Sequence, residues 1–163
     1  MSRGDAGKLS APARKVFAEQ LQTCSRQNDV MITGVTGTDL DQDAQKCWLM
    51  KAIPGKPTDT TDLRLEIVWL QGTVLESDPE WIVIHDGTGR VRGELNDVRK
   101  ANKIMAGDAV VSKGAYVILV GTILSVGEIP VLRAVKCSEL EDADVHKELW
   151  QSEVLHQQRF VSR

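Results

Sequence analysis

The sequence predicts a mainly β fold, in which a small barrel of strands carries a short helix before it and a longer helix after it. Three observations predict it: five closely spaced segments rich in β-branched and aromatic residues, glycine-containing turns between them, and a final segment with helical periodicity. Five strands with a glycine in the first and a connection between the third and fourth are typical of the OB-fold barrel. Periodicity alone also permits an SH3-like barrel or a split α+β sheet.

The composition fits one globular domain. A chain of 163 residues with 42% hydrophobic residues can bury a core but is short for two ordinary domains. Because no segment approaches the roughly 18 apolar residues of a membrane span or the apolar core of a signal peptide, we expect an intracellular protein without membrane contacts. The widely spaced Cys24, Cys47 and Cys137 predict reduced, partly buried thiols rather than a disulfide framework or a zinc site.

Upstream of the barrel, one helix is predicted in otherwise irregular chain. Residues 1–10 are small and polar, and we expect them to be disordered. Residues 11–24 are predicted to form the N-terminal helix, because Ser10 is a suitable N-cap and apolar residues recur at three- and four-residue spacing. Residues 25–63 are rich in Gly, Thr and Asp and are predicted to be a variable loop region with one possible short strand, "CWLMKAI".

Residues 64–140 are predicted to form the barrel, beginning with the strand "EIVWLQGTVLES". Alternation along this strand buries Val68, Leu70, Gly72 and Val74 and turns Trp69 to the outside. The later strands are predicted at "WIVIHD" and "RVRGEL", joined by the turn "DGTG", and at "AYVILVGTILSV" and "PVLRAVKC", joined by "GEIP". Between the two pairs, "NDVRKANKIM" is a short helix or an irregular connection.

Residues 141–161 are predicted to form the C-terminal helix, with acidic residues in its first turns and an arginine near its end. At 100° per residue its apolar side chains fall into two adjacent stripes. Such a helix can pack on its own domain and still offer a face to a partner. One stripe contains Val145, Leu149 and Phe160, and the other contains Trp150, Val154 and Val161.

The charge distribution argues against a protein that holds nucleic acid by itself. The net charge is −3, and Lys+Arg minus Asp+Glu is 8 − 8 in residues 1–63, 9 − 9 in residues 64–137 and 3 − 6 in residues 138–163. No region has the basic excess that nucleic-acid binding usually requires. We therefore expect little or no direct nucleic-acid binding.

The strands that bind oligonucleotides in many OB-folds carry few aromatic and cationic residues in this sequence. Such proteins combine several aromatic residues with a cationic groove. The second and third predicted strands offer Trp81 alone, and Arg90 and Arg92 share their face with Glu94. An autonomous single-strand-binding OB-fold protein is therefore the alternative function and not the preferred one.

The sequence contains no recognisable catalytic or metal-binding constellation. His85, His146 and His156 lack metal-ligand spacing, and the pair His85–Asp86 lies at a predicted turn without a nucleophile. The glycines of "GTGRVRG" lie in a predicted hairpin and do not have the dinucleotide-binding spacing. We expect no enzymatic activity, no metal and no cofactor.

Several segments together resemble the RecQ-mediated genome instability protein 2 family: "RKVFAEQL", "VWLQGTV", "GRVRGEL", "GAYVILVGTI" and "LRAVKCSELEDADVHKELWQSEV". They keep their order and cover about residues 14–24 and 64–156, whereas residues 25–63 do not align. The resemblance implies a non-catalytic nuclear scaffold that pairs with the C-terminal OB-fold of RecQ-mediated genome instability protein 1. It also implies support for the Bloom helicase–topoisomerase IIIα complex in double Holliday junction dissolution, and a docking surface for a peptide of the Fanconi anaemia group M protein.

The same resemblance assigns site residues. Lys15, Trp69, Lys136 and Trp150 match interface positions of the family, and Lys136 with Trp150 is the candidate peptide-docking pair. From the residues alone, Trp69 is alternatively a core or rim residue or a base-stacking platform, Trp150 packs in the protein's own core, and the lysines are ordinary surface residues. The predicted partner interface comprises Lys15, Phe17, Trp69, Trp150 and Val154.

Overall fold

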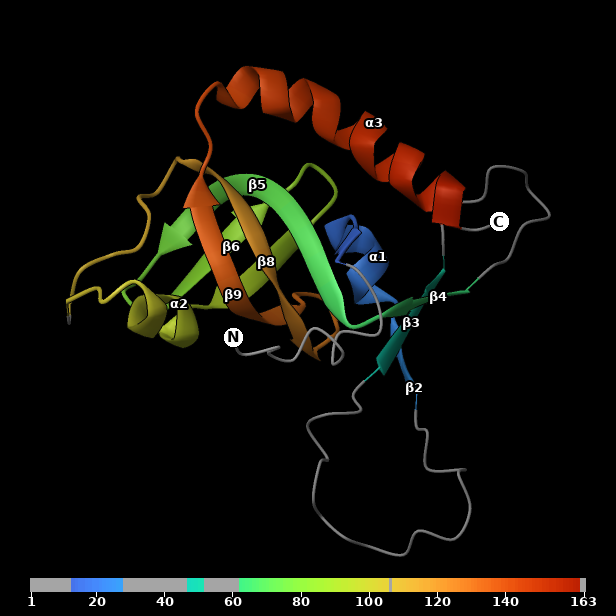
Figure 1. The fold of residues 1–163 in the computed structure, drawn as a ribbon, viewed down its shortest axis with the longest axis horizontal. Coiled ribbons are helices and arrows are strands. Elements are labelled where there is room, and N and C mark those ends of the chain that lie inside the picture. The colour runs from blue at the N-terminus through green and yellow to red at the C-terminus, as the bar shows by residue number, and fades with distance from the viewer. Residues whose placement is uncertain (1–12, 28–46, 52–61, 106, 162–163) are drawn as a thin grey trace, which may run out of the picture.

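The computed structural model describes residues 13–27, 47–51, 62–105 and 107–161, and the predicted disorder of residues 1–10 lies outside this range. Figure 1 shows a barrel with a long helix across its top and a small separate sheet at one end. The elements are β1 (Arg14–Lys15), α1 (Ala18–Gln22), β2 (Ser25–Gln27), β3 (Cys47–Lys51), β4 (Asp62–Leu65), β5 (Ile67–Ser77), β6 (Trp81–His85), β7 (Arg90–Glu94), α2 (Asn96–Ala101), β8 (Tyr116–Ser125), β9 (Val131–Glu139) and α3 (Ala143–Val161).

The five long strands close into the predicted OB-fold barrel. Their order is β5-β6-β7-β9-β8, and β5 also pairs with β8, which closes the sheet on itself. Only the β7–β9 pairing within this ring is parallel. The helix α2 connects the third barrel strand to the fourth, as one of the two readings of that segment predicted. Closure removes the unpaired edges that a flat five-stranded sheet would leave.

The alternation predicted for the first barrel strand is confirmed. Val68 and Leu70 are fully buried and Val74 is 1% exposed, whereas Trp69 is half-buried on the opposite face. Gly72 lies in the buried row where β5 and β6 come close, since a Cβ there would lie 2.7 Å from the carbonyl oxygen of His85. The inward-facing residues of all five strands form one core.

The predicted N-terminal helix over residues 11–24 is wrong in its extent, because the described chain enters as a strand. Arg14 and Lys15 pair in parallel with β5, and the five-residue helix α1 follows. The hairpin between β6 and β7 fixes where α1 begins. Asp86 Oδ2 accepts a hydrogen bond from the Ala18 amide at 2.8 Å, and Thr88 Oγ1 accepts one from the Glu19 amide at 3.1 Å. These tertiary contacts decide between strand and helix against the local periodicity.

The loop predicted over residues 25–63 contains more regular structure than expected. The possible strand at "CWLMKAI" is confirmed as β3, and β2 and β4 flank it in an antiparallel sheet of order β2-β3-β4. Alternate side chains of β3 and β4 join the barrel core, which explains why this sheet forms. They are Trp48, Met50, Leu63 and Leu65.

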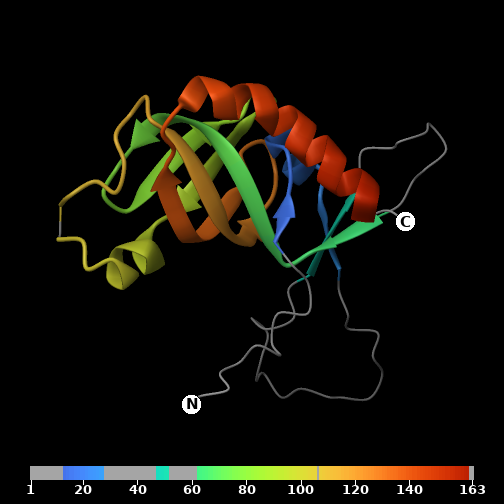
Figure 2. The same cartoon turned by 45° about the horizontal axis from the view of Figure 1, so that its top comes forward.

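The helix α3 crosses the outside of the barrel, over β5 and beside β1 (Figures 1 and 2). Its two predicted stripes have different environments: Trp150 and Val154 are buried, whereas Val145 and Leu149 are 54% and 50% exposed. The side chains of Phe160 and Val161 lie outside the described part. In the described part of the chain, no helix combines the length and apolar character needed to cross a membrane.

Candidate functional site

Three of the residues predicted as site residues form one row across the outer face of the barrel. Lys15 on β1 pairs with Trp69 on β5, Trp69 pairs with Val120 on β8, and Val120 pairs with Lys136 on β9. Residues paired in this way place their side chains on the same face of a sheet. The row therefore brings together positions that are up to 121 residues apart (136 − 15), and it adds Val120, which the sequence reasoning missed.

Lys15 connects this row to α3, although it lies on a strand and not on the predicted helix. Its Nζ lies 5.1 Å from the centroid of the Trp69 ring and 3.8 Å from Glu153 Oε2. The first contact is a cation–π interaction, and both partners of the ion pair are partly exposed, so each contact adds little to stability. Their combined effect is to orient the lysine under the helix.

Two glutamines of α3 complete the free edge of β1. The Lys15 amide donates to Gln157 Oε1 at 2.5 Å, and Gln158 Nε2 donates to the Lys15 carbonyl at 3.0 Å. The Gln158 amide also pairs reciprocally with that of Gln20 on α1, with both nitrogen-to-oxygen distances at 2.9 Å. An unpaired strand edge is a template for further pairing, and here side chains cover it. No periodicity rule identifies such glutamines.

Beneath α3 lies a small apolar cluster that contains the other three predicted interface residues. Phe17 is 6% exposed, Trp150 3% and Val154 0%, and Trp69 and Leu155 pack against them. These residues contact one another within the chain, so the protein's own packing is their observed environment. Their role in a partner interface remains a prediction.

The predicted peptide-docking pair is not equally accessible. Lys136 is exposed on β9, next to Val135, which is 53% exposed. The indole of Trp150 is buried, and its Nε1 has no hydrogen-bond partner among the residues that the structure describes. A ligand can reach Lys136 directly, whereas contact with the Trp150 ring requires movement of α3.

The outer face of β6 and β7, which binds oligonucleotides in many OB-folds, is occupied by internal contacts. The Arg92 guanidinium lies 4.6 Å from the centroid of the Trp81 ring, and its Nε lies 3.1 Å from Glu94 Oε1. The connections that would frame a ligand are short, residues 78–80 between β5 and β6 and residues 126–130 between β8 and β9. Arg92 is therefore engaged within the protein, and the exposed Arg90 is the other arginine predicted on this face, which is fewer cations and aromatics than single strands require.

The side chains of His85 and Asp86 stabilise the turn between β6 and β7. Asp86 Oδ1 accepts hydrogen bonds from the Thr88 amide and hydroxyl at 2.8 and 2.7 Å and from the Gly89 amide at 3.1 Å, while Oδ2 caps α1. His85 Nδ1 accepts from the Gly87 amide at 2.9 Å. The turn thus uses both side chains to hold its own backbone. Among the described residues, no group of three or more His, Cys, Asp or Glu is placed to hold a metal ion.

The two thiols that the structure describes, Cys24 and Cys137, are free and are more completely buried than the sequence predicted. Burial raises the pKa of Cys24 to about 12 and that of Cys137 to about 11, because a thiolate is poorly solvated in the core. Nucleophilic thiols have lowered pKa values instead. These thiols therefore behave as small apolar core residues.

The closed five-stranded barrel, the helix over its outer face and the exposed apolar stripe on that helix define a small OB-fold protein with an uncovered helical surface. The family model described as RecQ-mediated genome instability protein 2 matches residues 12–158. The chain belongs to the RecQ-mediated genome instability protein 2 family, which confirms the resemblance seen in the sequence.

Individual relatives agree with this assignment. RecQ-mediated genome instability protein 2 of Gallus gallus is 30% identical over 159 residues, which are 96% of this chain and 98% of that protein. The alignment therefore extends through most of residues 25–63, which the sequence resemblance had left unaligned. The Mus musculus protein of the same name is 33% identical over 92 residues, or 56% of this chain and 58% of that protein.

Two solved structures are similar at low sequence identity. A crystal structure of the S. pombe Stn1-ten1 complex contains a chain 19% identical, with coverage of 61% of this chain and 78% of that chain and a TM-score of 0.45. A replication protein A heterotrimer bound to ssDNA contains a chain 18% identical, with coverage of 69% and 89% and a TM-score of 0.46.

Proposed function

We propose that this protein is a non-catalytic scaffold subunit that pairs with a second OB-fold, the C-terminal OB-fold of RecQ-mediated genome instability protein 1. The observation that carries the proposal is the environment of α3. Its Trp150 and Val154 stripe is buried on the barrel, whereas Val145 and Leu149, one helical turn apart, are each about half exposed. An exposed apolar stripe beside a buried one is what a helix presents when a partner covers its second face.

Family membership supports the larger assignment. We infer that the pair assists the Bloom helicase–topoisomerase IIIα complex in dissolving double Holliday junctions, in the nucleus, and so preserves genome stability. A peptide of the Fanconi anaemia group M protein would dock on the same assembly, with the exposed Lys136 ammonium offered to a carboxylate or to backbone carbonyls. Pairing with the second OB-fold would place a composite surface around this lysine.

The alternative, an autonomous single-strand-binding protein, has weaker support. Arg92 is engaged by Trp81 and Glu94, and the chain has a net charge of −3. Protein–single-strand complexes depend on free cations and stacked aromatics, and their affinity falls steeply with salt. Titration with labelled single-stranded DNA at two salt concentrations is expected to give negligible binding. Tight, salt-sensitive binding would favour the alternative.

The pairing is tested by co-expression with the C-terminal OB-fold domain of RecQ-mediated genome instability protein 1. Val145→Glu combined with Leu149→Glu places two charges on the exposed stripe and is expected to weaken the complex at least about 10-fold, a loss of about 1.4 kcal/mol. Affinity is measured by titration calorimetry on the purified chains. The control, Gln151→Glu, places a charge on an exposed polar position about 200° around the same helix from Leu149, away from the stripe, and is expected to leave the complex intact.

The folded state of each variant is checked separately, because a change at a buried interface residue can weaken both folding and partner binding. Trp150→Ala removes a buried side chain and is expected to lower the free energy of unfolding by about 3–5 kcal/mol. A lost complex in that variant therefore reports folding as much as docking. If the doubly charged stripe variant folds normally and binds like wild type, the proposed use of α3 is wrong.

A further inference from the structure

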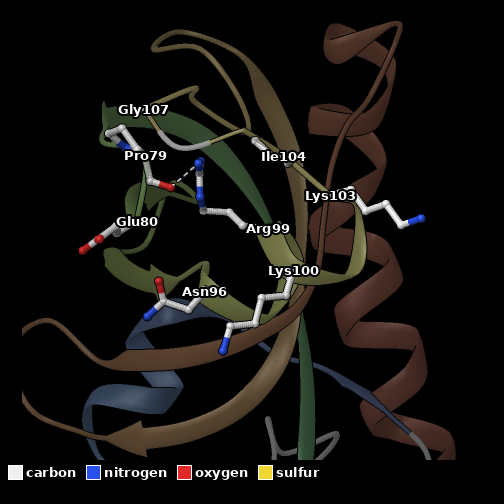
Figure 3. A pocket seen from close by; sticks show the side chains of 8 residues that line it. All are labelled: Pro79, Glu80, Asn96, Arg99, Lys100, Lys103, Ile104 and Gly107. Atoms are coloured by element: carbon white, nitrogen blue, oxygen red, sulfur yellow. Dashed lines mark hydrogen bonds between the residues drawn. The ribbon is translucent and has the colours of Figure 1, made fainter.

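A pocket of about 520 Å³ lies at the end of the barrel where α2 meets the connection between β5 and β6. Figure 3 shows Arg99 at its centre, with the other side chains arranged around it. The volume falls within the range of ordinary ligand sites. Its lining residues are Pro79, Glu80, Asn96, Arg99, Lys100, Lys103, Ile104 and Gly107.

Arg99 makes the pocket a preformed part of the fold. Its Nη1 donates to the Pro79 carbonyl at 2.8 Å and also to the Asp108 carbonyl, and its Nη2 donates to the Met105 carbonyl at 2.5 Å. These bonds tie the segment after α2 to the segment before β6. Because three carbonyls hold the guanidinium, it is not available as a bidentate fork for a phosphate group.

The free charge at the pocket is positive. Lys100 and Lys103 are exposed, and in the described part of the chain neither has a carboxylate within ion-pair distance. Figure 3 shows both ammonium groups directed away from Arg99. The acidic residue nearest in sequence, Asp97, is paired with Arg133, with 2.6 Å between its Oδ2 and the arginine Nε. The Arg133 hydrogen bond is the main cause that lowers the pKa of Asp97, and the charge of Lys100 is a minor one. Two exposed lysines that form no ion pair among the described residues therefore lie at the rim of one pocket.

Apolar surface accompanies these charges. Ile104 lines the pocket and is half-buried, and the adjacent Met105 is 73% exposed, more than any other large apolar side chain in the described residues. Exposed methionines are common at surfaces that bind peptides, because the side chain adapts to different contacts. A nucleic-acid backbone would make no use of this apolar contact, whereas a peptide with an apolar side chain would.

We propose that the α2 pocket docks a short segment of a partner protein that combines acidic and apolar side chains. Two acidic side chains of the segment pair separately with Lys100 and Lys103, whose ammonium groups point in different directions in Figure 3, and an apolar side chain packs on Ile104 and Met105. In both overall views α3 runs along the top of the barrel and α2 lies at the lower left, so that barrel strands separate α2 from the N-terminal half of α3, which carries the exposed Val145 and Leu149 (Figures 1 and 2). The pocket is therefore a second docking surface, independent of the pairing proposed above, and it remains open when α3 is covered.

The test uses the full chain labelled with ¹⁵N and a set of ten-residue peptides, each carrying two Asp or Glu residues around one Leu or Phe. Amide peaks of Asn96 to Gly107 are expected to shift on addition of an acidic peptide, and matched peptides with Asn or Gln in place of the acids are expected to bind at least about 10-fold more weakly. Lys100→Glu with Lys103→Glu is expected to weaken acidic-peptide binding at least about 10-fold. Lys113→Glu, an exposed lysine outside the pocket lining, is the matched control and is expected to bind like wild type.

Three results would overturn the proposal. The first is that no acidic peptide at millimolar concentration shifts the α2 peaks, and the second is that the Lys100→Glu, Lys103→Glu double variant binds as well as wild type. The third is that single-stranded DNA shifts the same peaks while the peptides do not, which would assign the pocket to nucleic acid. None of these results bears on the α3 interface, so the two proposals fail separately.

Discussion

Gln158 shows how a single buried polar residue joins three parts of this fold. Its side chain is 1% exposed, and its amide bonds to the Lys15 carbonyl and, reciprocally, to Gln20. Gln20 Oε1 also accepts from the Phe17 amide at 2.9 Å, at the start of α1. Buried polar groups are stabilising only when their partners are in place, so these two amides fix the position of α3 relative to β1 and α1.

Replacement of Gln158 by Leu is expected to lower the free energy of unfolding by about 1–3 kcal/mol, because it removes the buried hydrogen bonds that Gln158 makes with the Gln20 amide and the Lys15 carbonyl. The double variant with Gln20→Leu is expected to cost less than the sum of the single changes by about 0.5 kcal/mol or more, because the two amides bond to each other. Urea denaturation followed by circular dichroism measures both. The exposed Gln151→Leu on the same helix is the control, expected within about 0.5 kcal/mol of wild type. Strictly additive changes would show that the two amides do not act as a pair.

Among the elements, the barrel depends on close approach of β8 and β9. A Cβ added at Gly121 would overlap the carbonyl of Arg133, in the stretch where the register of these strands shifts. Backbone cannot move aside as a flexible side chain can. Gly93 on β7 offers a comparison, because the nearest atoms to an added Cβ there are the side-chain methyls of Leu119, at 3.1 Å.

Gly121→Ala is therefore expected to destabilise the protein by about 3 kcal/mol or more, whereas Gly93→Ala costs about 1 kcal/mol. Thermal unfolding of both variants gives the comparison. Equal melting temperatures for the two variants would contradict the assignment of Gly121 as the point where the barrel strands meet most closely.

The sequence predicted the elements that form through contacts between residues close in the chain, and it missed those that form through contacts between distant residues. The barrel strands were predictable, because buried and outward-facing side chains alternate along consecutive residues, as in Val68, Trp69 and Leu70. The strand β1 was not, because Arg14 and Lys15 become a strand only by pairing with β5, more than fifty residues later. Local apolar spacing there predicted a helix, and tertiary contacts determined otherwise.

The candidate site divides in the same way. The resemblance identified Lys15, Trp69 and Lys136, and the register of four strands explains why they lie in one row. The two stripes of α3 were predictable from its 100° periodicity, but which stripe is buried was not, because that depends on the surface against which the helix packs. The pocket beside α2 could not be predicted from the sequence. Arg99 shapes it by binding backbone carbonyls, and because every residue has a carbonyl, no residue pattern marks such a contact.

On the scale of the whole molecule, the two proposed docking surfaces are separated by the barrel. Val145 and Leu149 are exposed on the helix that crosses the top of the barrel, and the α2 pocket lies at its end. The barrel between them is rigid because closure and a single core connect all five strands. A small rigid body with two separate surfaces is suited to hold two partners at a fixed spacing, as a scaffold requires.

The stability of the whole molecule is expected to fall as pH rises from about 9 to about 12. Burial raises the pKa of Cys24 from 9.0 to about 12 and that of Cys137 from 9.0 to about 11. Burial, followed by the nearby charges of Asp86 and Glu153, raises the pKa of Tyr116 from 10.0 to about 12. Over this range the unfolded chain releases these protons while the folded protein keeps them. The unfolded state therefore binds fewer protons, and the free energy of unfolding decreases with pH until the folded groups also ionise.

Urea denaturation at a series of pH values from 8 to 12 measures this slope. Cys24→Ala combined with Cys137→Ala removes two of the three groups, so the free energy of unfolding of the variant is expected to fall less steeply with pH than that of wild type, whatever its value at pH 8. Cys24 follows the end of α1, and its Sγ lies 3.3 Å from the Gln20 carbonyl oxygen. Equal slopes for variant and wild type would show that the buried thiols do not govern alkaline unfolding.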